Sequence, residues 1–135
     1  MKESFVLTGI VVRGNQLGRA IGFPTANIDP GKNTCLGVKK GVYAARIKIK
    51  DKVYNGMANI GVRPTLDQHK LTFEVHIFDF SEELYGQTIS VYLHDFIREE
   101  KRFSGLDELK NQLHRDESEV RRILSGWMQP DTQAQ

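Results

Sequence analysis

The sequence has little cysteine and no long apolar run. Its one cysteine, Cys35, has no partner for an internal disulfide or for a cysteine-rich metal site, so burial or a loop position is the expected role. The N-terminus lacks a signal-peptide pattern, because the apolar stretch at residues 5–12 is short and is broken by Thr8 and Gly9. We therefore expect a cytoplasmic protein without a membrane partner.

An excess of charge of one sign is also missing. The 135 residues include 19 Lys and Arg against 17 Asp and Glu, which gives no electrostatic reason to expect nucleic acid as the main partner. The length suits one domain with a real core. We expect that domain over residues 1–128, followed by a polar, disordered tail over residues 129–135.

The first two thirds of the chain alternate in the manner of β-strands. In residues 42–50, for example, every second side chain from Tyr43 to Ile49 is apolar. Strands are predicted over residues 5–12, 42–50, 53–60, 71–78 and 88–97. No long helical segment separates them, so antiparallel pairing is expected.

From residue 106 onwards the apolar residues follow a helical period. They are Leu106, Leu109, Leu113, Val120, Ile123, Leu124 and Trp127. Ser104 and Asp107 have the spacing of a capping box, and Gly126 provides a stop. The sequence predicts an amphipathic helix whose apolar stripe packs on the sheet.

Residues 14–27 read GNQLGRAIGFPTAN and place three glycines, Gly14, Gly18 and Gly22, around the cation Arg19. Glycines let backbone N–H groups approach an anion closely. The segment is not a Walker A loop, because no Gly-Lys-Ser/Thr follows at the required distance. An ordinary glycine-rich surface loop remains the alternative for the glycines alone.

Two oxygen-bearing side chains, Thr25 and Asn27, end the same segment. Hydroxyl and amide oxygens are hard ligands of the kind that Mg²⁺ accepts. Glu74 lies on the opposite face of its predicted strand from Phe73 and Val75, and it could supply the base that an attacking hydroxyl needs. Its ordinary alternative is a solvent-facing or ion-paired glutamate.

Together these motifs resemble the riboflavin kinase family. The resemblance rests on the glycine segment with its PTAN ending, on Asn59-Ile60-Gly61-Val62-Arg63-Pro64-Thr65, on Glu74-Val75-His76-Ile77-Phe78, on Leu84-Tyr85-Gly86, and on Phe96-Ile97-Arg98 leading to Lys101-Arg102-Phe103. Order and spacing match from about residue 5 to about residue 125. The resemblance is greatest to the C-terminal kinase half of bacterial bifunctional riboflavin kinase/FAD synthetases.

The resemblance implies a closed antiparallel Greek-key β-barrel of about six strands, covered by the long C-terminal helix. It implies transfer of the ATP γ-phosphate to the 5′-hydroxyl of riboflavin, giving FMN and ADP, with Mg²⁺. The implied site residues are Gly14, Gly18, Arg19, Gly22, Thr25 and Asn27 for the nucleotide, Thr25 and Asn27 for Mg²⁺, Glu74 as general base, and Arg98 and Phe103 for the flavin. For Arg98, a solvated surface arginine is the alternative.

Other interpretations stay open at this stage. The chain is either a stand-alone kinase or a domain of a longer protein with an upstream nucleotidyltransferase domain, and alone it is expected not to make FAD. A flavin-binding barrel without kinase activity would have no use for PTAN or Glu74. A barrel that binds single-stranded nucleic acid would need a basic, aromatic groove. The balanced charge of the chain argues against such a groove.

Overall fold

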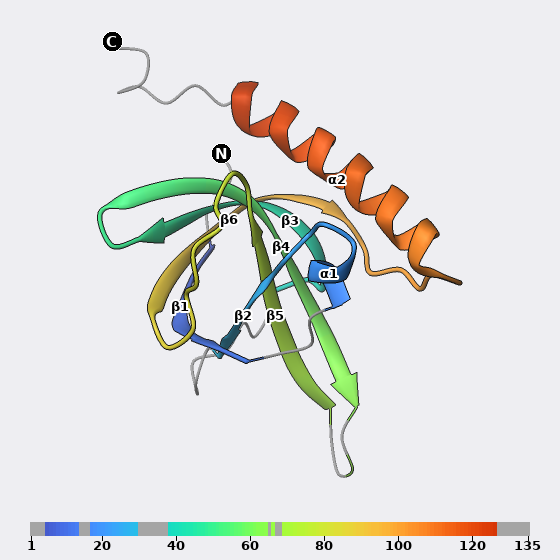
Figure 1. The fold of residues 1–135 in the computed structure, drawn as a ribbon, viewed down its shortest axis with the longest axis horizontal. Coiled ribbons are helices and arrows are strands. Elements are labelled where there is room, and N and C mark those ends of the chain that lie inside the picture. The colour runs from blue at the N-terminus through green and yellow to red at the C-terminus, as the bar shows by residue number, and fades with distance from the viewer. Residues whose placement is uncertain (1–4, 14–16, 30–37, 65, 67–68, 127–135) are drawn as a thin grey trace.

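The structure, a computed structural model, describes residues 5–13, 17–29, 38–64, 66 and 69–126. Six antiparallel strands close into a barrel in the order β1-β2-β5-β4-β3-β6 (Figure 1). Their bounds are β1 Phe5–Val12, β2 Ala26–Asp29, β3 Gly41–Ile49, β4 Lys52–Pro64, β5 His69–Ile77 and β6 Thr88–Arg98. The predicted closed six-stranded antiparallel barrel is confirmed.

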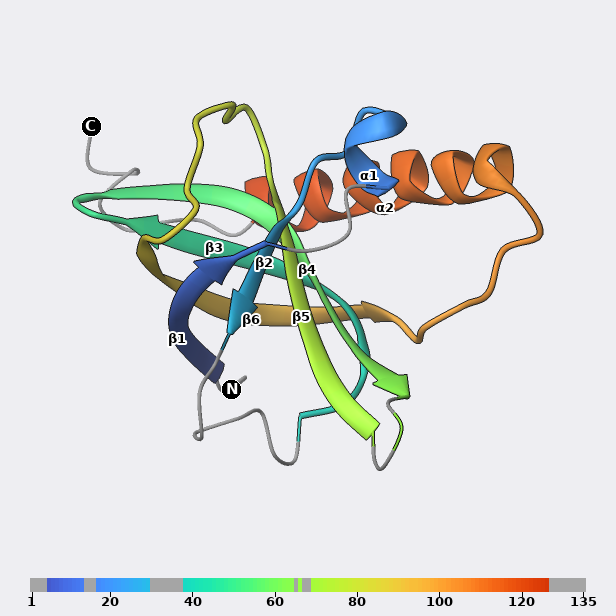
Figure 2. The same ribbon diagram turned by 60° about the horizontal axis from the view of Figure 1, so that its bottom comes forward.

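The strand order has a Greek-key arrangement. Strands β3, β4 and β5 follow one another in sequence and in space, and β6 returns to lie beside β3 (Figure 2). The β3–β4 connection is a tight turn, since Ile49 pairs with Lys52 and Lys50 has a φ of 56°. The barrel is thus built around a long β3–β4–β5 meander.

Strand β2 is the strand that alternation in the sequence did not reveal. It is only four residues long, which is too short for a period of two to be recognised. It pairs with β1 through Val12 and Asn27, and with β5 through Asn27 and Glu74. The end of the glycine segment is therefore part of the barrel wall.

The rest of the glycine segment is only partly an irregular loop. A short helix, α1 (Leu17–Ala20), includes Gly18 and Arg19. Gly22 has a φ of 91°, a left-handed conformation that favours glycine over residues with a side chain. Gly14 and the expected tail at residues 129–135 lie outside the described residues.

The barrel interior is filled by the apolar face of each strand. Ile47, Ile60 and Val91 have no exposed surface, and the predicted inward face of β3 lies in this core. On β5 the inward residues are Phe73 and Val75, which leaves Glu74 on the outer face. The predicted orientation of Glu74 is therefore correct.

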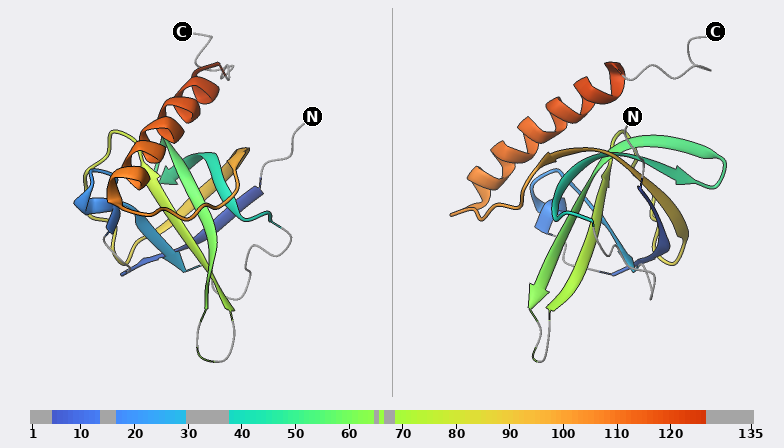
Figure 3. Two further views of the ribbon diagram at one scale, coloured as in Figure 1. Left: turned by 90° about the vertical axis from the view of Figure 1, so that its right-hand side faces the viewer. Right: turned by 180° about the vertical axis from the view of Figure 1, so that it is seen from behind.

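A second apolar cluster lies outside the barrel, under helix α2 (Leu106–Gly126). Figure 3 shows this helix running along the outside of the barrel. It packs through Val120 and Leu124 against Met57 and Phe78. Within the described part of the chain, neither helix is both long enough and apolar enough to cross a membrane.

Two details at the start of α2 differ from the sequence prediction. Leu106 is 48% exposed, because the first turn of the helix extends past the barrel, so the apolar stripe starts later than predicted. The backbone N–H of Ser104 donates a hydrogen bond to the carboxylate of Glu108 at 2.8 Å, and not to that of Asp107. Trp127 lies outside the described residues.

Phe23 joins the glycine segment to this second cluster. Its side chain is 3% exposed, and its ring makes edge contacts with His76 of β5 at 5.2 Å and with His114 of α2 at 4.9 Å between centroids. The chain is thereby fixed two residues before Thr25, with α1 beside α2 (Figures 1 and 2).

We predict that Phe23→Ala lowers the free energy of unfolding by about 3–5 kcal/mol, because a large ring is removed from a closed contact between helix and barrel. Urea unfolding followed by far-UV circular dichroism measures this change. Val53→Ala, at a side chain 59% exposed, is the control and should change stability by about 0.5 kcal/mol or less. Equal losses in the two variants would contradict the packing described.

Candidate active site

Glu74 occupies the middle of a row of polar side chains on the outer face of the barrel. In the sheet, Glu74 pairs directly with Asn27 of β2 on one side and with Asn59 of β4 on the other. Side chains directly opposite each other on neighbouring strands have Cβ atoms about 5 Å apart. The barrel register therefore brings a carboxylate between two amides that are 32 residues apart in the sequence.

Thr25 contacts Glu74 directly. The Thr25 hydroxyl donates a hydrogen bond to Glu74 Oε1 at 3.1 Å. A hydroxyl has one proton and two lone pairs, so this bond leaves the oxygen of Thr25 free to accept or to coordinate. Two predicted site residues that are 49 positions apart are thus in contact.

His76 holds the chain that leads to Thr25. Its Nδ1 lies 2.7 Å from the carbonyl oxygen of Pro24, and because a carbonyl only accepts, Nδ1 carries the proton in this contact. His76 is thus hydrogen-bonded to the backbone of the segment that precedes Thr25. It positions Pro24 and, through it, the Thr25 hydroxyl beside Glu74.

A cavity of about 630 Å³ opens at one end of the barrel, and Thr25 is one of the residues that line it. Its lining includes the cations Arg13 and Arg19, the polar residues Thr25 and Asn27, and residues 80–85. The guanidinium of Arg13 lies 4.5 Å from the centroid of the Tyr85 ring. The sequence analysis missed Arg13, although its position directly before Gly14 was a usable signal.

Thr25 and Asn27 line this cavity, and their side chains carry oxygens of the kind that Mg²⁺ accepts. Among the described residues, no group of three or more His, Cys, Asp or Glu is placed to hold a metal by itself. Mg²⁺ in nucleotide sites usually has few protein ligands and completes its coordination with phosphate oxygens and water. The donor set at the cavity is of this kind.

Arg98 lies on the opposite side of Glu74 from Asn27. Around the barrel, Asn59 pairs with Val42 of β3, and Val42 pairs with Arg98 of β6. The predicted nucleotide residues Thr25 and Asn27 and the predicted flavin residue Arg98 are thus separated by Glu74.

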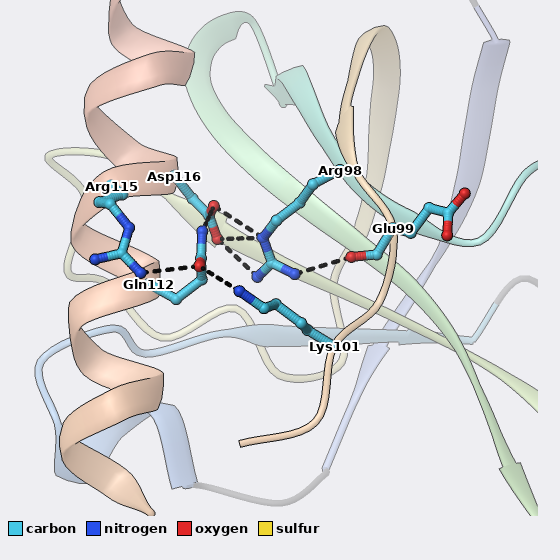
Figure 4. A network of polar contacts seen from close by, with 6 residues as sticks. All are labelled: Arg98, Glu99, Lys101, Gln112, Arg115 and Asp116. Atoms are coloured by element: carbon cyan, nitrogen blue, oxygen red, sulfur yellow. Dashed lines mark hydrogen bonds and ion pairs between the residues drawn. The ribbon is translucent and has the colours of Figure 1, made fainter. Parts of the chain in front are cut away.

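The alternative of a solvated Arg98 is wrong. Its guanidinium forms a forked ion pair with Asp116 of α2 at 2.8–3.1 Å, and their side chains are 18% and 2% exposed (Figure 4). A further bond runs from Nη1 to the carbonyl oxygen of Glu99 at 3.0 Å. Phe103 lies 5.9 Å from the guanidinium, measured to the ring centroid.

Gln112 extends this network along α2. Its amide donates to Asp116 Oδ1 at 2.9 Å and accepts from Lys101 Nζ at 3.2 Å and from Arg115 at 3.0 Å (Figure 4). The sequence analysis missed Gln112 and Asp116. Their signal was two polar residues four apart that flank Leu113 on the buried side of the helix, and both are buried.

Glu100 lies between these anchored residues and close to Glu74. Burial raises the pKa of Glu100 above its ordinary value, and the nearby negative charge of Glu74 raises it further, while Arg98 and Lys40 act in the opposite direction. Ionised Glu100 is thus disfavoured by its surroundings. The sequence analysis did not single it out.

The arrangement defines a class of site: a small barrel with a carboxylate on its outer face, flanked by a cation-lined cavity on one side and by a segment anchored to a helix on the other. The family model for flavokinases, described as riboflavin kinase, matches residues 1–124. The chain belongs to the riboflavin kinase family.

Individual relatives agree with this assignment. The chain is 46% identical over 121 residues to the bifunctional riboflavin kinase/FMN adenylyltransferase of Escherichia coli (strain K12), covering 89% of this chain and 38% of that protein. The chain spans 37–40% of the length of the first three curated relatives that it matches.

Two solved structures are also similar. A structure described as a macrolide-efflux protein from Streptococcus pneumoniae superposes with a TM-score of 0.80 at 40% identity, over 86% of this chain and 38% of that chain. Riboflavin kinase from Trypanosoma brucei superposes with a TM-score of 0.66 at 27% identity, over 98% of this chain and 85% of that chain.

We predict that Asp116→Asn destabilises the protein by about 3 kcal/mol, because it leaves the half-buried Arg98 guanidinium without its counter-charge. Thermal and urea unfolding at neutral pH measure the loss. Glu119→Gln on the same helix breaks the exposed pair with Arg122 and should lose little stability, because solvent screens that pair. A similar small loss for Asp116→Asn would show that the network does not hold α2 to the barrel.

We predict a pH-dependent stability difference for Glu100→Gln. The pKa of Glu100 is raised in the folded protein, so the parent loses stability relative to the variant as pH rises above the ordinary value of 4.5. The melting temperature of Glu100→Gln minus that of the parent should therefore increase from acid to neutral pH. A difference that falls with pH would contradict the burial of this carboxylate.

Proposed function

We propose that this chain catalyses transfer of the γ-phosphate of ATP to the 5′-hydroxyl of riboflavin, giving FMN and ADP. The observation that carries the proposal is the position of Glu74, bonded to Thr25 and lying between the Asn27 side and the Arg98 side of the outer face. A base between two substrate regions is what a direct transfer requires, since the attacking hydroxyl and the phosphate must meet in line.

On the nucleotide side, Gly14, Gly18, Arg19 and Gly22 bind the phosphates. Arg13 adds a second cation to the lining of the cavity that includes Arg19. Thr25 and Asn27 hold Mg²⁺ through their side-chain oxygens. The bound ion neutralises charge on the phosphates. Both ligands are neutral, so they do not reduce the charge that the ion offers.

At the centre, Glu74 takes the proton from the 5′-hydroxyl as that oxygen attacks phosphorus. The hydrogen bond from Thr25 fixes Oε1 and leaves Oε2 for the substrate. General base catalysis of this kind contributes ~10²–10⁴ in rate. His76 supports the same geometry through Pro24.

On the flavin side, Arg98 and Phe103 contact the ring system of riboflavin. Asp116 and Glu99 occupy three of the N–H groups of Arg98, and a guanidinium has five, so part of it stays available for a ligand. Its orientation is fixed before the flavin binds. A fixed donor loses less conformational freedom on binding than a free arginine.

The domain context of the chain, its product and its location are also proposals. Several relatives are described as bifunctional riboflavin kinase/FMN adenylyltransferases, which favours an upstream nucleotidyltransferase domain as the partner of this module in a longer protein. By itself the module makes FMN and not FAD. The expected cytoplasmic location stays a prediction. A flavin-binding barrel without activity is less favoured, because it leaves Thr25, Asn27 and Glu74 without a use.

We predict that the purified chain releases ADP from ATP only when riboflavin and Mg²⁺ are both present. Glu74→Gln should lower kcat by about 10²-fold or more, and Asn27→Ala should raise the Mg²⁺ concentration needed for half-maximal rate. A coupled ADP assay, with FMN identified by chromatography, measures both changes. Asn55→Ala, at an exposed amide elsewhere on β4, is the control and should match the parent.

Two outcomes would contradict the proposal. Full turnover by Glu74→Gln would show that Glu74 is not the general base. Binding of riboflavin by the parent without any ADP release would favour the inactive flavin-binding barrel.

A further inference from the structure

We propose that Glu100 is a further riboflavin-binding residue, whose carboxylate accepts hydrogen bonds from hydroxyl groups of the ribityl chain. The inference rests on the proposed kinase function and assigns one more contact in that site. It also gives a role to Gly61, which the resemblance left without one.

The first observation is the contact between Glu100 and the backbone at Gly61. Asn59 and Gly61 share the outer face of β4, because Ile60 between them is buried in the barrel. A Cβ atom added at Gly61 would overlap Oε2 of Glu100 and lie 3.0 Å from its Cδ. The glycine therefore provides the surface on which the carboxylate rests.

The second observation is the position of this contact relative to Glu74. Gly61 pairs with Thr72 and Asn59 pairs with Glu74, so the two pairs are consecutive outer-face pairs of the β4–β5 ladder. Such pairs are about 7 Å apart along a strand. Glu100 thus approaches Glu74 from the β4 side, while Thr25 and Asn27 approach it from the β2 side.

The third observation is that the chain is held on both sides of Glu100. Arg98 is bound by Asp116, and Lys101 is bound by Gln112, both from α2 (Figure 4). Within the described part of the chain, no hydrogen bond or ion pair joins the Glu100 carboxylate to another residue. The neighbouring Glu99 differs, since its carboxylate lies 3.6 Å from Lys39 and is 76% exposed.

These observations point to a ligand that donates hydrogen bonds. An ionised carboxylate only accepts them, and a second carboxylate beside Glu74 is electrostatically unfavourable unless donors lie between the two. A ribityl chain offers a hydroxyl on several successive carbons. If it crosses the outer face from Glu100 towards Glu74, its terminal hydroxyl arrives at the base.

The test measures kinetics with riboflavin and ATP varied separately. Glu100→Ala should raise KM for riboflavin roughly ten- to hundredfold, as expected for loss of hydrogen bonds to a charged group, with KM for ATP within about twofold of the parent. Glu100→Gln should show a smaller increase, because its amide oxygen still accepts. Glu99→Gln is the matched control and should leave both KM values unchanged.

Gly61→Ala tests the same contact without changing the carboxylate. The backbone at Gly61 is not left-handed, and the overlapping atoms are the end of a long side chain, so the new methyl group should displace Glu100 rather than unfold the barrel. KM for riboflavin should rise as it does in Glu100→Ala, with the melting temperature near that of the parent. In the double variant the two increases should not multiply.

A flavin with a methyl group in place of the ribityl chain identifies the part of the substrate that is recognised. Fluorescence titration should show equal affinity of the parent and Glu100→Ala for this flavin, and weaker binding of riboflavin by the variant. An unchanged riboflavin affinity, or an equal loss for both flavins, would overturn the inference. Because the titration needs no turnover, a parent without kinase activity would reject the proposed function while still testing Glu100.

Discussion

The register of β5 against its two neighbours is the constraint on which the site depends. One residue of β5, Glu74, pairs with Asn27 and with Asn59 at once, and barrel closure fixes both pairings. A shift of one residue would turn Glu74 inward and Phe73 outward. The apolar core that fills the barrel therefore also determines which side chains surround the carboxylate.

Helix α2 adds a second constraint from outside the barrel. Its apolar residues hold Phe23, which fixes the approach to Thr25, and its polar residues Gln112 and Asp116 hold the segment after β6. The same helix thus positions chain segments on both sides of Glu74. This explains why a barrel with a complete interior core also carries a helix of 21 residues on its outer face.

Much of the fold followed from the sequence, because long strands and a long amphipathic helix have clear periods. The alternation of β5 was sufficient to place Glu74 on the outer face. Strand β2 was missed because four residues do not establish a period, and its existence depends on partners in β1 and β5. The residues of the glycine segment were recognised, whereas the bond from Thr25 to Glu74 depends on closure of the barrel. Gln112, Asp116 and Glu100 were missed because their roles arise only when α2 packs against the barrel.

The central claim is that Glu74 separates a nucleotide side from a flavin side of one site. A crystal structure of the chain with ADP, Mg²⁺ and riboflavin tests it most directly. The account predicts the ADP phosphates beside Thr25 and Asn27, with the terminal ribityl hydroxyl within hydrogen-bond distance of Glu74. A flavin bound with that hydroxyl away from Glu74, or with both ligands on the same side of it, would contradict the account.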